Sequence, residues 1–191
     1  MPPLAAPRTA SALALAALAP GCATTGTRPT ETAKRDAQYN GSIDRLLLVF
    51  ESNDLSAAYL GKEFQPRVAA QLGELLKPRG VATESMTLSG EDLDPNKPVG
   101  ATATRVRATH VLHVTLTGVL SRTKTDASYF QGMPPWRWVE DLKFSFQLHD
   151  VLVGKIVWRG ELKYPDPPSP EALAAKFVES LGSERFLQTG H

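Results

Sequence analysis

The sequence predicts an α/β (α+β) domain with the element order β-α-β-α-β-β-β-α, and three observations lead to this prediction. Residues 46–50 form a continuous apolar run, which is typical of a strand buried on both faces. Residues 60–76 repeat large apolar side chains at helical spacing. Residues 142–148 and 156–164 alternate apolar and polar side chains, as strands of an antiparallel sheet with one wet face do.

The first half of the domain has the pattern of two strand–helix–strand units. A strand over 43–50 is followed by polar residues and by the helical repeat, in which Pro66 predicts either a break or a helix that begins near it. A second strand over 81–88, a short helix over 99–107 and a third strand over 109–120 come next. Such units place their strands in parallel through right-handed crossovers.

The second half continues from a loop over 121–135 into the two alternating strands. Gly154 suits the hairpin turn between them, and Ser169 and Pro170 suit the cap and first position of a last helix. We therefore expect a mixed sheet with two parallel crossovers and a C-terminal antiparallel meander, with helices mainly on one face.

Cys22, the only cysteine, closes an N-terminal segment that carries Arg8 and an apolar run over 10–19. This run is short for a membrane span and suits the core of a signal peptide. A small residue directly before such a cysteine resembles the lipobox of bacterial lipoproteins, in which the thiol is acylated with chains such as palmitate and the leader is removed. The alternative is an ordinary cleaved signal in which Cys22 has no role.

These observations divide the chain into a lipoprotein signal peptide (1–21), a flexible tether (22–42) and a single α/β domain (43–187). The tether is assigned because residues 23–42 contain almost no large apolar side chain, although Tyr39 could equally begin the folded part. Without Arg8, the 21 basic and 20 acidic residues become 20 of each, so the domain has no electrostatic footprint for nucleic acid. With Cys22 acylated, no disulfide and no cysteine metal site can form.

Three segments resemble a loose group of bacterial periplasmic lipoproteins. This group includes small uncharacterised lipoproteins, activators of penicillin-binding proteins and the lipoprotein subunit of the curli secretion channel. The similar segments are the strand over 43–50, the entry into the middle strand over 108–114, and the hairpin over 147–160 with its aspartate, Gly-Lys turn and tryptophan. The turn departs from the usual pattern because Val151-Leu152-Val153 replaces more polar residues. The resemblance implies the fold and an accessory role in the envelope.

Catalytic and metal-binding patterns are weak in this sequence. There is no Gly-x-Ser-x-Gly elbow and no glycine-rich phosphate loop. His113 and His149 lie on polar strand faces, where they could act as a base or bind a metal together with Asp141, but surface histidines are common on such faces. We expect no catalytic residue, no metal and no cofactor.

The segment with the composition of a protein-binding hot spot is Trp136-Arg137-Trp138, which follows a proline pair at a loop-to-strand junction. The alternative is that Trp138 starts the strand and packs in the core while Trp136 covers its edge.

We therefore expect a non-enzymatic, lipid-anchored accessory protein that binds a partner protein in the cell envelope. Ala23, rather than an aspartate, follows the cysteine, which by analogy with enterobacterial sorting predicts the outer membrane, facing the periplasm. The expected partners are the membrane, through the N-terminal lipid, and an envelope protein, with no nucleic acid. Two alternatives stay open: an envelope hydrolase that uses His113 or His149, and an oligomeric export-channel component.

Overall fold

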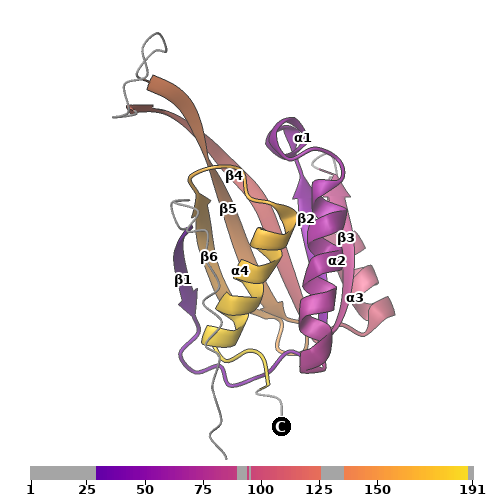
Figure 1. Ribbon diagram of the computed structural model, residues 1–191. Coiled ribbons are helices and arrows are strands. Elements are labelled where there is room, and N and C mark those ends of the chain that lie inside the picture. The colour runs from indigo at the N-terminus through magenta and orange to yellow at the C-terminus, as the bar shows by residue number, and fades with distance from the viewer. Residues whose placement is uncertain (1–28, 90–93, 95, 126–135, 189–191) are drawn as a thin grey trace, which may run out of the picture.

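The computed structural model describes residues 29–89, 94, 96–125 and 136–188, which form a six-stranded mixed sheet with helices on both faces (Figure 1). The strand order across the sheet is β1-β6-β5-β4-β2-β3. The strands are β1 (Thr30–Arg35), β2 (Arg45–Ser52), β3 (Ala82–Ser89), β4 (His110–Thr125), β5 (Trp136–Asp150) and β6 (Lys155–Tyr164). The helices are α1 (Asp54–Tyr59), α2 (Phe64–Leu76), the 3₁₀ turn η1 (Lys77–Arg79), α3 (Asn96–Val106) and α4 (Pro170–Ser183).

The predicted fold class is confirmed by the strand pairings. β2 lies between β3 and β4 and is parallel to both, whereas β4, β5 and β6 form the expected antiparallel meander. Pro66 lies in the first turn of α2, where a missing N–H breaks no helical hydrogen bond, so the helix begins near the proline rather than breaking at it. Ser169 caps α4 by accepting a hydrogen bond from the Ala172 amide at 3.1 Å.

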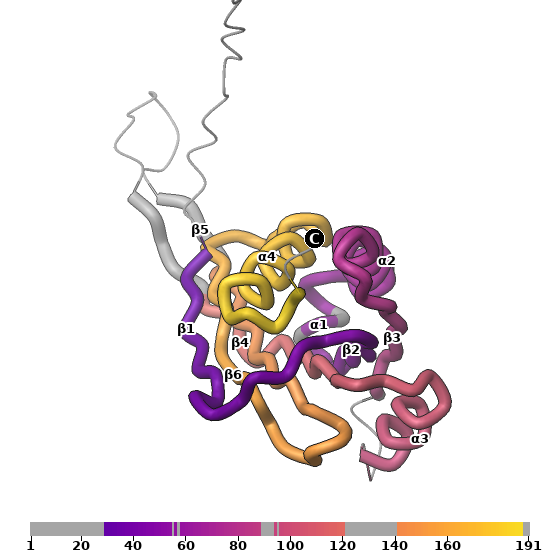
Figure 2. Tube along the Cα trace, turned by 90° about the horizontal axis from the view of Figure 1, so that it is seen from below, coloured from indigo at the N-terminus to yellow at the C-terminus, as the bar shows by residue number. Residues whose placement is uncertain are grey.

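The helices α2 and α4 cover one face of the sheet, and α3 packs on the other (Figure 2). β2 is buried on both sides because its side chains alternate between these layers. Leu46 and Leu48 belong to the large core under α2 and α4, whereas Leu47 and Val49 belong to the smaller cluster under α3. On this face of the meander, α3 reaches only the start of β4 and the end of β5. Further along the strands polar side chains occupy the face, including the ion pair between Lys143 and Glu161 at 2.7 Å.

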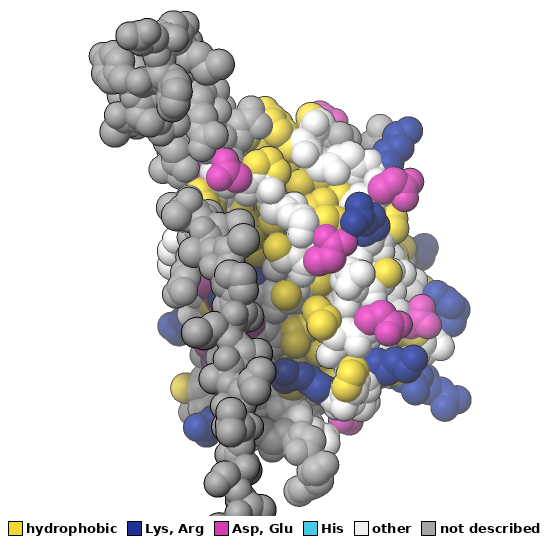
Figure 3. All heavy atoms as spheres, viewed as in Figure 1, with side chains coloured by type: hydrophobic (Ala, Val, Ile, Leu, Met, Phe, Trp, Pro, Cys, Tyr) yellow, Lys and Arg dark blue, Asp and Glu magenta, His cyan; other side chains and the backbone are white. Residues whose placement is uncertain are grey.

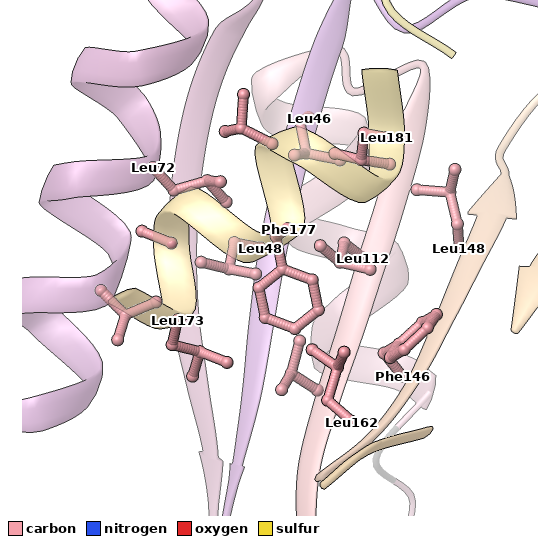
Figure 4. Close-up of a cluster of buried hydrophobic side chains, with 14 of the residues drawn as sticks. Leu46, Leu48, Leu72, Leu112, Phe146, Leu148, Leu162, Leu173, Phe177 and Leu181 are labelled. Carbon is pink, nitrogen blue, oxygen red and sulfur yellow. The ribbon is translucent and has the colours of Figure 1, made fainter. Parts of the chain in front are cut away.

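The main core fills the space between the meander, β2 and the two helices α2 and α4 (Figure 4). Phe146 of β5 and Phe177 of α4 meet edge to face, with ring centroids 5.8 Å apart. Phe146 also packs on Trp158 of β6, with centroids 4.2 Å apart. These contacts lock the last helix onto the meander.

The flexible tether predicted for 22–42 is wrong for part of its length, because residues 30–35 form β1 and pair antiparallel with β6. α4 stabilises this polar edge strand: Glu31 accepts a hydrogen bond from the Ser180 hydroxyl at 2.6 Å and lies 3.0 Å from the Lys176 ammonium. Arg35 stacks over the ring of Phe186 at 4.3 Å from its centroid. Tyr39 is also buried. The folded domain therefore includes at least about a dozen residues before the start predicted at residue 43.

Candidate functional site

The end of the β4–β5 hairpin projects beyond the rest of the sheet (Figure 1). β6 ends opposite Leu142, and the pairing of β2 with β4 ends at Thr115, but β4 and β5 continue to pair with each other as far as Thr125 and Trp136. We call the paired residues 120–125 and 136–141 the arm. The loop predicted over 121–135 is therefore too long, because residues 121–125 belong to β4.

Trp136, Arg137 and Trp138 lie at the outer end of the arm. Their backbone pairs with Thr125, Lys124 and Thr123 respectively. The segment lies at a loop-to-strand junction, as the sequence predicts, although the strand β5 begins at Trp136 and not at Trp138. All three positions lie beyond the last residue of β5 that pairs with β6. The backbone thus places this segment away from the main core, while its role as a hot spot stays a prediction.

His113 and His149 come together beside a cavity of about 230 Å³ between α3 and the meander. His113 pairs with Gln147 and His149 pairs with Val111, so the two histidines are diagonal neighbours on one face of the β4–β5 pair. Leu88, Val99 and Val111 supply apolar walls.

Both histidines of this cavity favour the neutral imidazole. Burial lowers the pKa of His113, against the opposing charge of Glu51. Burial also lowers the pKa of His149, and repulsion from His113 lowers it further. His113 Nε2 is buried without a hydrogen-bond partner, since Glu51 Oε2 lies 3.9 Å away and instead accepts a hydrogen bond from Thr115. A neutral imidazole in a cavity is a potential general base.

Asp141, the third ligand considered for a metal, pairs with Leu120 in the arm, far along β5 from His149. Across the described ranges, no group of three or more His, Cys, Asp or Glu side chains is placed to hold a metal ion.

A buried polar cluster that sequence reasoning missed joins Tyr39, His110 and Asp150. The Tyr39 hydroxyl lies 2.6 Å from His110 Nε2 and donates a hydrogen bond of 2.6 Å to Asp150 Oδ2. Burial lowers the pKa of His110. Burial raises the pKa of Asp150, but hydrogen bonds from Tyr39 and from the turn amides outweigh it, so the net shift is downward.

The second carboxylate oxygen of Asp150 shapes the turn between β5 and β6. Asp150 Oδ1 accepts hydrogen bonds from the amides of Leu152 at 2.8 Å and Val153 at 3.0 Å. Gly154 completes the turn with φ of 69°, a conformation that favours glycine. The turn displays Val151, Leu152 and Val153 to solvent, and Leu152 is 88% exposed. We call these three residues the apolar tip.

The sequence did indicate the apolar tip, because Val151-Leu152-Val153 replaces the more polar residues that are usual in the turn of the similar lipoproteins. The sequence did not indicate the cluster of Tyr39, His110 and Asp150, because His110 and Asp150 follow Tyr39 by 71 and 111 residues along the chain.

Cys22 and the predicted leader lie outside the described residues. In the part of the chain that the structure describes, no helix has both the length and the apolarity needed to cross a bilayer.

The sequence matches no protein-family model and no curated protein. Several solved structures are similar to it in fold. One is the PelC dodecamer from Paraburkholderia phytofirmans, at 16% identity and a TM-score of 0.45, covering 81% of this chain and 95% of that one.

Two further similar structures are of bacterial lipoproteins. Lipoprotein GNA1162 from Neisseria meningitidis is 15% identical with a TM-score of 0.37, covering 73% of this chain and 96% of that one. A minor lipoprotein from Acinetobacter baumannii is 12% identical with a TM-score of 0.35, covering 77% and 98%. These similarities concern the fold, and no conclusion about the activity of this chain rests on them.

Proposed function

We propose that this chain is a non-catalytic, lipid-anchored protein of the bacterial envelope that binds a partner protein through the arm. The observation that carries the proposal is the projection of β4 and β5 past the sheet. In the described residues, the arm strands pair only with each other, so both of their outer edges are available for backbone hydrogen bonds to a partner.

The composition of the arm supports the same proposal. Trp and Arg are the residue types most enriched among hot spots of protein interfaces, and Trp136, Arg137 and Trp138 lie together at its outer end. An anchor at Cys22, in the outer membrane and facing the periplasm, would keep the arm among envelope proteins. A non-catalytic accessory role agrees with the absence of a nucleophile motif from the sequence.

The experiment is site-specific photocrosslinking in living cells, with the crosslinking residue placed at Trp136 and, as the control, at Lys62 between α1 and α2. We expect a discrete crosslinked protein from position 136 and none from position 62. In a second experiment, the crosslinking residue is placed at Lys124. We expect Trp138→Ala to reduce the yield of the crosslinked protein at least about fivefold, as for a hot-spot residue. Equal crosslinking from positions 136 and 62 would refute the proposal.

A second candidate function is an envelope hydrolase, and the cavity beside His113 and His149 is the observation that favours it. One of the two neutral imidazoles would act as the base. Replacing the histidine that acts as the base, by His113→Ala or by His149→Ala, would then abolish an activity that the intact protein shows on ester or amide substrates. Unchanged turnover in both variants, with no metal in the purified protein, would end this reading.

A further inference from the structure

The apolar tip is a rigid, convex hydrophobic surface at the end of the sheet opposite the arm. Leu152 is 88% exposed, Val153 59% and Val151 39%, and Ile156 just beyond the turn is 38% exposed. Figure 2 shows the β5–β6 turn extending from the sheet toward the side of α3. Three consecutive exposed aliphatic residues in a hairpin turn oppose the usual preference of turns for polar residues.

Every backbone N–H group of this turn has a partner within the protein. The amide of Val151 donates to the Thr109 carbonyl at 2.9 Å, and the amide of Gly154 donates to the Asp150 carbonyl at 2.9 Å. The amides of Leu152 and Val153 donate to the Asp150 carboxylate. A segment that enters the apolar part of a bilayer must satisfy its own backbone donors, and this turn satisfies its donors before any contact is made.

Basic residues lie at the same end of the sheet as the tip, on the side of α3. The Thr109 carbonyl accepts the hydrogen bond from the Val151 amide, and the Thr109 amide donates to the Arg45 carbonyl. The Arg45 guanidinium donates to the Val106 carbonyl at the end of α3. The exposed side chains of Arg45, Arg105, Arg107 and Lys155 therefore lie at this end. Two acidic residues lie next to these cations. Asp36 lies 2.8 Å from the Lys155 ammonium, and Asp44 directly precedes Arg45.

The face with α2 and α4 also carries basic side chains at this end of the molecule. In Figure 3, several Lys and Arg side chains lie toward the lower end of the view, which is the end that holds the turn.

We propose that the apolar tip inserts into the surface of an anionic phospholipid bilayer, with the surrounding arginines against the lipid headgroups. Aliphatic side chains on a rigid turn enter the boundary between headgroups and acyl chains, and basic residues near them add attraction to anionic lipid. A small convex tip buries little area on a flat protein surface, whereas a bilayer encloses it completely.

The proposal is compatible with a lipid on Cys22 in the same membrane. Thr30, at the start of β1, pairs with Lys163, whereas the turn joins β6 at Lys155. The distance along β6 between these two residues is about 26 Å at the rise of a strand. The eight residue steps from Cys22 to Thr30 reach about 27 Å when extended. A fully extended segment from Cys22 to Thr30 would therefore just span this distance, which would allow both groups to reach one bilayer.

The test is a fluorescent probe that reports the polarity around one residue. In the full chain with Cys22→Ala, Val153→Cys provides the only thiol and is labelled with an environment-sensitive dye. We expect a blue shift, and quenching by bilayer-located spin labels, on vesicles of phosphatidylethanolamine and phosphatidylglycerol. We expect neither change with the dye on Lys62→Cys at the other end of the sheet. A dye at position 153 that stays in water on these vesicles would overturn the proposal.

Two matched pairs of variants test the parts of the surface separately. Leu152→Ser should weaken vesicle binding about tenfold, whereas Leu120→Ser, which alters an exposed leucine at the arm end, should not. Arg107→Glu should weaken binding to the anionic vesicles more than Lys62→Glu, and high salt should remove this difference. Equal effects within either pair would contradict the proposed orientation on the membrane.

Discussion

Tyr39 shows how much of this fold depends on a single hydroxyl group. It joins the segment after β1, the start of β4 and the β5–β6 turn by touching His110 and Asp150. Tyr39→Phe would leave both partners buried with one hydrogen bond fewer each, so we expect the free energy of unfolding to fall by about 2–3 kcal/mol. Urea unfolding measures this change. Tyr59→Phe, at an exposed position in α1, should cost less than about 0.5 kcal/mol, and an equal loss in both variants would contradict this role.

Buried His110 and half-buried His113 and His149 give the protein a pH dependence with a defined sign. Burial holds the pKa values of His110, His113 and His149 below the ordinary value of 6.5, so the unfolded chain binds more protons than the folded one as the pH falls below 6.5. The free energy of unfolding should therefore decrease between pH 7 and pH 5, as measured by urea unfolding at a series of pH values. Asp150 adds a loss at lower pH, below its ordinary value of 3.8. His149→Gln should reduce the slope between pH 7 and 5, and stability that increases on acidification would contradict the assignment.

At the scale of single elements, β1 and β6 approach each other closely because β6 has a glycine at position 160. A Cβ atom there would lie 2.6 Å from Phe146 Cζ and 2.7 Å from Ala33 Cα. We expect Gly160→Ala to lower the free energy of unfolding by about 1–3 kcal/mol, since the backbone of β1 has to move. Gly100→Ala is the control, because a Cβ in α3 meets no atom within 4 Å and should stabilise the helix by about 0.5–1 kcal/mol. The comparison requires only thermal or urea unfolding of the two variants.

The arm is expected to serve binding and not stability. Its strands pair only with each other among the described residues, so removing residues 121–140 and closing the hairpin with Asn-Gly should leave the unfolding midpoint nearly unchanged. The same deletion should abolish the crosslinked product expected from the arm. Calorimetry and crosslinking from Lys143, which remains in the shortened chain, give both readings. A large loss of stability would mean that the arm belongs to the core.

The elements that the sequence predicted are those whose apolar periodicity is strong. The β2 run, the α2 repeat and the alternation along β5 all follow from the burial that their side chains need. β1 could not be predicted, because the sequence Thr-Glu-Thr-Ala-Lys-Arg has no apolar period. Its stability comes from the β6 edge and from α4, which follow about 120 residues or more later in the chain.

At the scale of the whole molecule, the proposed location in the cell envelope depends on Cys22. We expect Cys22→Ala to move the protein from the membrane fraction toward the soluble fraction and to remove the acyl mass from the mature chain. The unfolding midpoint of the purified domain should stay the same, because the first described strand, β1, begins eight residues after Cys22. Intact mass spectrometry and fractionation of both forms make the measurement, and a native chain without acyl mass would contradict the anchor.

The candidate sites could be predicted from the sequence only in part, for a reason that applies to the whole molecule. The histidine pair was recognisable because both residues fall on the polar faces of strands in one meander. The cluster of Tyr39, His110 and Asp150 depends on bringing three distant segments to one end of the sheet. A short stretch of sequence predicts a helix or a strand, but it does not predict which distant segments come into contact in the fold.

β5 runs without a break from Trp136 to Asp150, so one strand has the proposed partner site at its start and the apolar tip directly after its end. At the rise of an extended strand, these two ends lie about 45 Å apart. A protein bound at the first end and a lipid surface touching the second would be kept at a set separation. The length of the β4–β5 hairpin would then set the distance between the partner and the membrane. Adding or removing pairs of residues in β4 and β5 would change that distance.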